Sequence, residues 1–217
     1  MRAAEVITKS ARPPPINVAM RDKGYTYLDS GVEQTAYLAP DGTILKLFPS
    51  NWDNKLSKGQ NSFIEFANYC QSRSNNPFLP QFGGWSKFNY DGTVYLQIKS
   101  ERLFPFTSNG GLMLDRIVER TKKIPIEQVI DEISNYSDEL TYGGNVADKD
   151  SWLSEVITLL GGKKELILFV RTIKDLAEIA KRKGYKLDLH SKNFMVTSDG
   201  EIVINDPFFA GGRGPRY

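Results

Sequence analysis

The sequence predicts an α+β protein in which antiparallel strands precede a helical second half. Between residues 25 and 98, short runs rich in β-branched and aromatic residues alternate with turns that contain Gly and Asp, a pattern typical of antiparallel hairpins. Between residues 112 and 183 the apolar residues recur instead at helical spacing. A polar hairpin follows at residues 185–209. A chain of 217 residues with these features fits one medium domain, or two lobes that share a cleft.

Five strands are expected to form an antiparallel sheet. They cover residues 25–28, 35–38, 43–48, 81–88 and 93–98. Turns separate the first three strands, and Asn89-Tyr90-Asp91-Gly92 joins the last two. Residues 1–20, which contain Arg12-Pro13-Pro14-Pro15, lack periodicity, so we expect a mobile N-terminal arm, with a proline-rich partner ligand as the alternative.

Five helices are expected around and after these strands. They cover residues 61–73, 112–120, 126–136, 151–160 and 163–183. The last has a continuous apolar stripe from Leu166 to Ala180 and is followed by Gly184, a residue that favours helix termination. We expect this helix to carry the loop that follows it.

Charge and composition argue against several classes of partner. The net charge of +2 provides no electrostatic footprint for nucleic acid. No run approaches the ~20 apolar residues of a membrane span, and the N-terminus lacks the apolar core of a signal peptide. Cys70 is the single cysteine, which excludes an intrachain disulfide and is compatible with a reducing compartment. We therefore expect a cytoplasmic protein without nucleic acid or membrane partners; a delivered effector would look the same.

Three oxygen-bearing side chains are expected to converge after the last helix. Asp188 and Asn193 are followed by a hairpin, with strands at 194–196 and 201–204, and then by Asp206. Such a hairpin returns Asp206 to the end at which Asn193 lies, near Asp188. Oxygen ligands of this kind suit a hard cation and a hydroxyl nucleophile.

This pattern resembles the catalytic loop and the metal-binding aspartate of the protein-kinase-like superfamily. The segment Leu187-Asp188-Leu189-His190-Ser191-Lys192-Asn193-Phe194-Met195, followed by Asn205-Asp206-Pro207, is most similar to the short serine/threonine protein kinases of T-odd (podovirus) bacteriophages. It is more distantly similar to aminoglycoside-phosphotransferase-like kinases, which also favour a histidine two places after the aspartate.

The resemblance covers about residues 25–209 and implies a bilobal protein-kinase-like fold. Residues 21–100 would form a five-stranded antiparallel N-lobe. Residues 101–217 would form a minimal, truncated helical C-lobe that contains the catalytic loop. Since eleven residues follow Asp206, we expect no activation segment and no helical platform for a peptide, and Asp-Pro-Phe stands where these kinases have Asp-Phe-Gly.

The resemblance also implies roles for the polar residues. Asp188 would act as the catalytic residue that orients the acceptor hydroxyl, while Asn193 and Asp206 would hold Mg²⁺ or Mn²⁺. Lys46 would be catalytic by holding the phosphates of ATP, with Glu65 as its ion-pair partner.

The residues alone leave other interpretations of this pair open. Lys46 alternates with apolar residues in its strand and could lie on a solvent-exposed face. Glu65 could complete a capping box that begins at Ser62.

The remaining nucleotide contacts are also implied by the resemblance. Gly31 would be the one glycine kept in the phosphate-covering loop, and Ala36 would lie over the base. Lys99 and Glu101 would lie in the hinge that contacts adenine through its backbone. His190 would either face the γ-phosphate, where protein kinases often have a lysine, or pack against its neighbours.

These features predict an ATP-dependent kinase that phosphorylates Ser or Thr of a protein target, itself included, in a cytoplasm that would be the host's if the protein came from a phage. One alternative is a catalytically silent, pseudokinase-type protein that sequesters a host protein. Another is a small-molecule phosphotransferase. For a protein acceptor, the helical insert 112–160 and the tail 211–217 are the candidate recognition segments.

Overall fold

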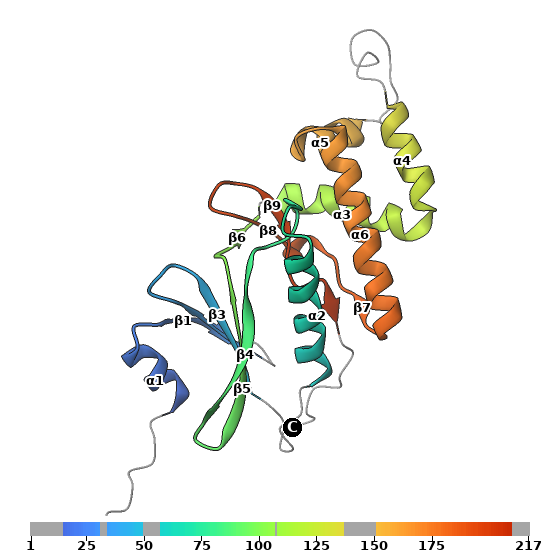
Figure 1. Cartoon of the computed structure of the whole chain (residues 1–217). Helices are drawn as coiled ribbons and strands as arrows, with labels where there is room; N and C mark the ends of the chain where they lie inside the picture. Colours follow the sequence, from blue (N-terminus) through green and yellow to red (C-terminus); the bar gives the residue numbers. More distant parts are fainter. Residues whose placement is uncertain (1–14, 31–33, 50–56, 107, 137–150, 210–217) are drawn as a thin grey trace, which may run out of the picture.

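The computed structural model describes residues 15–30, 34–49, 57–106, 108–136 and 151–209. Within these ranges the chain forms six α-helices, one short 3₁₀ turn and three antiparallel sheets (Figure 1). The predicted α+β class is confirmed. None of the helices in these ranges combines the length and the apolar character that a membrane crossing requires.

The largest sheet has five strands in the order β1-β2-β3-β5-β4, and every neighbouring pair is antiparallel. The strands are β1 (Thr26–Ser30), β2 (Thr35–Leu38), β3 (Ile44–Pro49), β4 (Phe82–Tyr90) and β5 (Thr93–Ser100). Each overlaps a predicted strand, so the five-stranded antiparallel sheet is confirmed. Asp91 and Gly92 form the two-residue turn between β4 and β5, and both have positive φ. Two-residue turns with positive φ are favoured in hairpins because their twist matches that of the strands that they join.

Helix α1 (Ile16–Asp22) packs on one face of this sheet. Its Met20 is buried in a cluster with three side chains of β2 and β3: Tyr37, Leu45 and Leu47. Residues 16–20 therefore belong to the fold, and the prediction of a mobile arm that extends to residue 20 is wrong for them; residues 1–14 lie outside the described ranges. A seven-residue helix is too short to be stable alone. Burial of Met20 against the sheet stabilises it, and that contact has no local sequence signal.

Helix α2 (Lys58–Ser72) covers the other face. Phe63 and Ile64 pack there in one cluster with three side chains of the sheet: Phe48, Leu96 and Ile98. The helix begins three residues earlier than predicted, because Ser57 and Gln60 form a reciprocal capping box at its start. The alternative in which Glu65 completes a capping box from Ser62 is therefore wrong.

The four remaining helices gather at one end of the molecule (Figure 1). They are α3 (Ser108–Lys123), α4 (Ile126–Asn135), α5 (Ser151–Leu159) and α6 (Lys163–Lys183). Helix α6 matches its predicted bounds, contacts α3, α4 and α5, and contributes its apolar stripe to the largest core cluster. It ends at Gly184, whose φ of +68° lies in the left-handed region that glycine adopts without strain.

Two small sheets contain the four strands that follow α6 together with β6, which lies between β5 and α3 in the chain. The first pairs β7 (Lys186–Leu187) with β10 (Phe208–Phe209), and the second has the order β6 (Phe104–Pro105), β8 (Phe194–Val196), β9 (Ile202–Ile204). The predicted final hairpin is thus confirmed as β8 and β9.

Polar contacts join α2 to α6. The Tyr69 hydroxyl donates to Asp175 over 3.1 Å, and the Lys58 ammonium donates to the carbonyl of Gly184 over 2.7 Å. Because these contacts lie near the middle and at the end of α6, they hold α2 against the C-terminal half of α6, while another face of α2 packs on the sheet.

The core predicts a large effect of substitution at Phe169. This side chain is fully buried, and its ring centroid lies 5.2 Å from that of Phe78 and 5.9 Å from that of Phe194. We expect Phe169→Ala to lower the free energy of unfolding by about 3–5 kcal/mol, measured by urea denaturation. The adjacent Leu168, which is 37% exposed, is the matched control; an equally large loss in Leu168→Ala would contradict this account of the core.

Candidate active site

The side chain of Asn193 joins the two chain segments that carry Asp188 and Asp206. Its Nδ2 donates one hydrogen bond to the carbonyl of Asp188 and another, of 3.2 Å, to the carbonyl of Asp206. The Asn205 N–H donates to the carbonyl of Asn193 over 2.7 Å. The structure therefore brings together the three residues whose convergence the sequence predicts.

Local strand pairing explains this convergence. Phe194 of β8 pairs with Ile204 of β9, which places the residues just outside the hairpin, Asn193 and Asn205, beside each other. On the other side, β7 pairs with β10, and the Asp188 N–H donates to the carbonyl of Pro207 over 2.8 Å. Asp188 is thus attached directly to the residue that follows Asp206.

Asp206 has a strained backbone and a buried carboxyl group. Its φ of +50° lies in the left-handed region, which is uncommon for residues other than glycine and is often found at functional sites. Burial raises the pKa of the carboxyl group, the charge of Lys46 lowers this pKa, and the charge of Asp188 raises it further. A carboxylate in this setting is stabilised by a cation close to it.

Lys46 supplies one such cation from β3. Its ammonium lies 4.4 Å from the ring centroid of Phe63 on α2. Burial lowers the pKa of Lys46, and the charge of Asp206 opposes this shift. The side chain is therefore on the α2 side of the sheet and interacts with Asp206, so the alternative of a lysine on a solvent-exposed face is wrong.

The neighbours of Lys46 in the sheet are a small residue and an apolar one. Ala36 of β2 is directly opposite Lys46, and Ile98 of β5 is opposite it on the other side. Residues paired in this way lie on the same face of a sheet. A small residue and a buried apolar one thus flank Lys46 in the sheet, and the place of Ala36 beside a nucleotide base stays a prediction.

Glu65 has a different partner from the one predicted. Its carboxylate lies 3.1 Å from the ammonium of Lys183 at the end of α6. Successive residues of a helix are about 100° apart, so Phe63 faces the sheet while Glu65 faces the flank on which α6 lies. The Lys46–Glu65 ion pair is therefore wrong for this structure.

The predicted hinge residues direct their side chains away from the Lys46 site. The Lys99 ammonium lies 3.5 Å from Asp41, in the turn between β2 and β3. The Glu101 carboxylate accepts the N–H of Gln81 over 2.6 Å, and the Glu101 N–H donates to the carbonyl of Gln81 over 3.0 Å. This N–H is therefore not available to a nucleotide.

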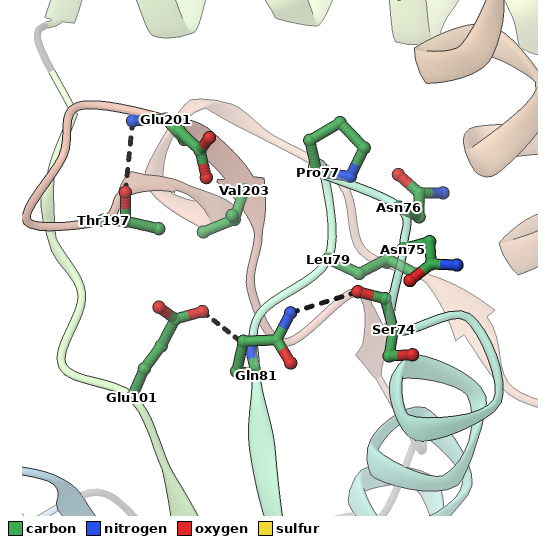
Figure 2. Close-up of a pocket in the computed structure, with 10 residues that line it drawn as sticks. All are labelled: Ser74, Asn75, Asn76, Pro77, Leu79, Gln81, Glu101, Thr197, Glu201 and Val203. Atoms are coloured by element: carbon green, nitrogen blue, oxygen red, sulfur yellow. Dashed lines mark hydrogen bonds between the residues drawn. The ribbon is translucent and has the colours of Figure 1, made fainter.

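Glu101 contributes instead to a separate polar pocket of about 180 Å³, which also contains Gln81 and Glu201 (Figure 2). Lys46, Asp188, Asn193 and Asp206 do not line it. Gly31, predicted to cover the phosphates, lies outside the described residues.

His190 stabilises the catalytic-loop turn. Its Nδ1 accepts the N–H of Lys192 over 3.2 Å at the start of the 3₁₀ turn Ser191–Asn193. The proton of a neutral ring is then on Nε2, which lies 3.9 Å from Oδ1 of Asp188. The half-exposed ring caps a turn, so it is not merely packed, and its contact with a γ-phosphate stays a prediction.

The donor set beside Asp206 fits a small hard cation. Because the amide hydrogens of Asn193 are used by the backbone carbonyls of Asp188 and Asp206, its Oδ1 is left as an acceptor. No group of three or more His, Cys, Asp or Glu side chains in the described ranges is arranged to enclose a metal ion. Mg²⁺ needs no such group, since it is usually held by one or two carboxylates together with water and substrate phosphates.

Comparison with known proteins leaves the family open. No protein-family model and no curated protein matches the chain. Among 52 matching chains of solved structures is that of the microcompartment-associated aminopropanol kinase, which is similar over 88% of this chain and 69% of its own, with 14% identity and a TM-score of 0.38. We base the functional inference on the residues of the site and not on this similarity.

With the predicted nucleotide site at Lys46, the Glu65–Lys183 pair predicts how ATP affinity should respond to substitution. Glu65→Gln and Lys183→Met break the same partly exposed ion pair, so each should lower the free energy of unfolding by at most about 1 kcal/mol. Neither substitution should change the Kd for Mg·ATP from the wild-type value. Lys46→Met should weaken that affinity, because it removes the cation beside Asp206. Calorimetric titration of the three variants measures this. Weaker binding in Glu65→Gln but not in Lys183→Met would show that Glu65 pairs with Lys46 when nucleotide binds.

Proposed function

We propose that this protein is a phosphotransferase that moves the γ-phosphoryl group of ATP to a hydroxyl group. The observation that carries the proposal is the bridging of Asp188 and Asp206 by the Asn193 side chain, with Lys46 acting on the Asp206 carboxylate. Two carboxylates, one amide oxygen and one ammonium in these positions match the needs of phosphoryl transfer, in which positioning and charge neutralisation provide the rate.

Each residue would have a distinct part. The side chain of Asp188 is 47% exposed, so an acceptor can reach it. Asp188 would accept the proton of the acceptor hydroxyl. At the same time the hydroxyl oxygen would bond to the γ-phosphorus, and the bond from this phosphorus to the β-phosphate oxygen would break. Lys46 would donate to the phosphate oxygens. Asp206 and Asn193 would hold Mg²⁺ or Mn²⁺, which when bound neutralises phosphate charge.

We also propose that the two halves of the molecule act as the two lobes of a kinase-like fold. Lys46 comes from the five-stranded sheet, whereas Asp188, Asn193 and Asp206 come from the segment that follows α6. The electrostatic coupling of Lys46 with Asp206 supports a nucleotide site between the halves. The division at residues 100 and 101 belongs to this proposal.

Two acceptor classes follow from the proposal. The resemblance of the catalytic loop to short phage kinases favours Ser or Thr of a protein. A small-molecule alcohol is the second class, because the same loop is also similar, more distantly, to aminoglycoside-phosphotransferase-like kinases. Incubation with labelled ATP and Mg²⁺, with cell lysate in one arm and a panel of amino alcohols in the other, separates them.

Substitution of the two aspartates should separate chemistry from binding. We expect Asp188→Asn to reduce turnover by at least about 100-fold, with the Kd for Mg·ATP unchanged, because Asp188 acts on the acceptor. Asp206→Ala should instead remove the dependence of ATP affinity on Mg²⁺. Calorimetry and transfer of labelled phosphate measure the two effects.

Three results would contradict this assignment. Full turnover in Asp188→Asn would exclude its role on the acceptor. Metal-dependent ATP binding in Asp206→Ala would exclude it as a ligand. Wild-type protein that binds Mg·ATP but transfers nothing in either arm would favour the binding protein that sequesters a partner.

A further inference from the structure

Helix α3 touches the backbone of the catalytic loop directly. A Cβ atom added at Gly111 would lie 2.9 Å from the Cβ of Ser191 and 3.3 Å from its Cα. Cβ atoms essentially never approach other atoms that closely, so only glycine at this position lets the helix lie against the loop. Ser191 is the first residue of the turn that ends at Asn193.

Asp115 lies one turn further along the same face of α3. Residues four apart in a helix are neighbours on its surface, so Asp115 follows Gly111 toward the loop. Its Oδ1 is buried and has no hydrogen-bond partner within the described ranges. Burial raises the pKa of the carboxyl group, whereas the N–H of Ser191, the charge of His190 and the hydroxyl of Ser191 lower it. Because Gly111, one turn earlier on the same face, lies against Ser191, Asp115 is on the side of α3 that meets the loop.

We propose that Asp115 is a positioning residue that holds the turn Ser191–Asn193 through the N–H and hydroxyl of Ser191, with Gly111 providing the close approach. The turn carries Asn193, whose side chain joins Asp188 to Asp206. A carboxylate fixed on a long helix would restrict this turn more firmly than the turn's own hydrogen bond to His190. The consequence for catalysis rests on the proposed function, whereas the restriction of the turn does not.

Helix α3 supplies a matched control. Glu119 lies one turn beyond Asp115, is exposed, and pairs with Lys122 at 2.9 Å. Glu119 and Gly111 are each four residues from Asp115, on opposite sides of it. In the described structure Glu119 makes no contact with the loop. Glu119→Gln should therefore change neither the loop nor the activity.

The first measurement is hydrogen exchange in the free protein. In Asp115→Asn, the amides of residues 191–193 should exchange faster than in wild type, while the melting temperature and the exchange of α6 stay unchanged. Gly111→Ala should produce the same local change by a steric route. Unchanged exchange at 191–193 in both variants would overturn the proposal, and faster exchange throughout α3 and α6 would show a role in general stability instead.

The second measurement is a double-mutant cycle with Ser191→Ala. Asp115→Asn should reduce turnover by about 10–100-fold, as loss of a group that orients a functional side chain typically does, and raise the Mg²⁺ concentration needed for ATP binding. The double variant should be no worse than Asp115→Asn alone, because both substitutions remove one interaction. If the losses of turnover in the two single variants add in the double variant, the proposed contact between Asp115 and Ser191 is wrong. If wild type transfers no phosphoryl group, the proposed function fails, and the exchange rates still decide whether Asp115 holds the turn.

Discussion

The two hydrogen bonds from the Asn193 amide are the interaction on which the site depends. They join the carbonyl of Asp188, which follows β7, to the carbonyl of Asp206, which lies between β9 and β10. A side-chain amide has two N–H donors and one acceptor oxygen. The two hydrogen bonds that Asn193 donates to the backbone therefore also fix the orientation of its Oδ1. The same side chain thus organises the loop and, under the proposed function, would also present a metal ligand.

Buried charge sets a second constraint. Lys46 and Asp206 each have a pKa displaced toward the neutral form by burial, and each opposes the shift of the other. Burying two opposite charges adds little to stability compared with apolar packing, and the left-handed φ of Asp206 is a further cost. The surrounding apolar clusters must stabilise this arrangement, which the proposed function would explain.

The attachment of α2 to α6 gives the site a rigid frame. Phe63 of α2 lies beneath the Lys46 ammonium, while Lys58, Glu65 and Tyr69 contact α6 or the residue that ends it. Helix α2 therefore contacts both α6 and the sheet and fixes their relative position. On the opposite side of the loop, the contact of Gly111 with Ser191 makes α3 part of the same frame.

The sequence by itself determined most of the longer elements and the convergence of three polar residues. Short runs rich in β-branched and aromatic residues, separated by turns, predicted the five strands of the large sheet, and helical spacing predicted α6 from Lys163 to Lys183 with its glycine end. The convergence of Asp188, Asn193 and Asp206 was predictable because a short hairpin is a local structure: its register follows from a few neighbouring residues.

Tertiary packing decided everything that depends on how distant elements meet. Glu65 pairs with Lys183 because the docking of α2 selects which of its sides faces the sheet. The N–H of Glu101 is used by Gln81, and Met20 is buried by strands that follow it in the chain. Asp115 and Gly111 had no sequence signal, since an acid and a glycine in a helix are ordinary until the helix lies against Ser191. Local pairing depends on residues that are neighbours in the sequence. The rotation of a helix about its axis and its contacts depend on side chains that are distant in the sequence, so they are known only from the packed structure.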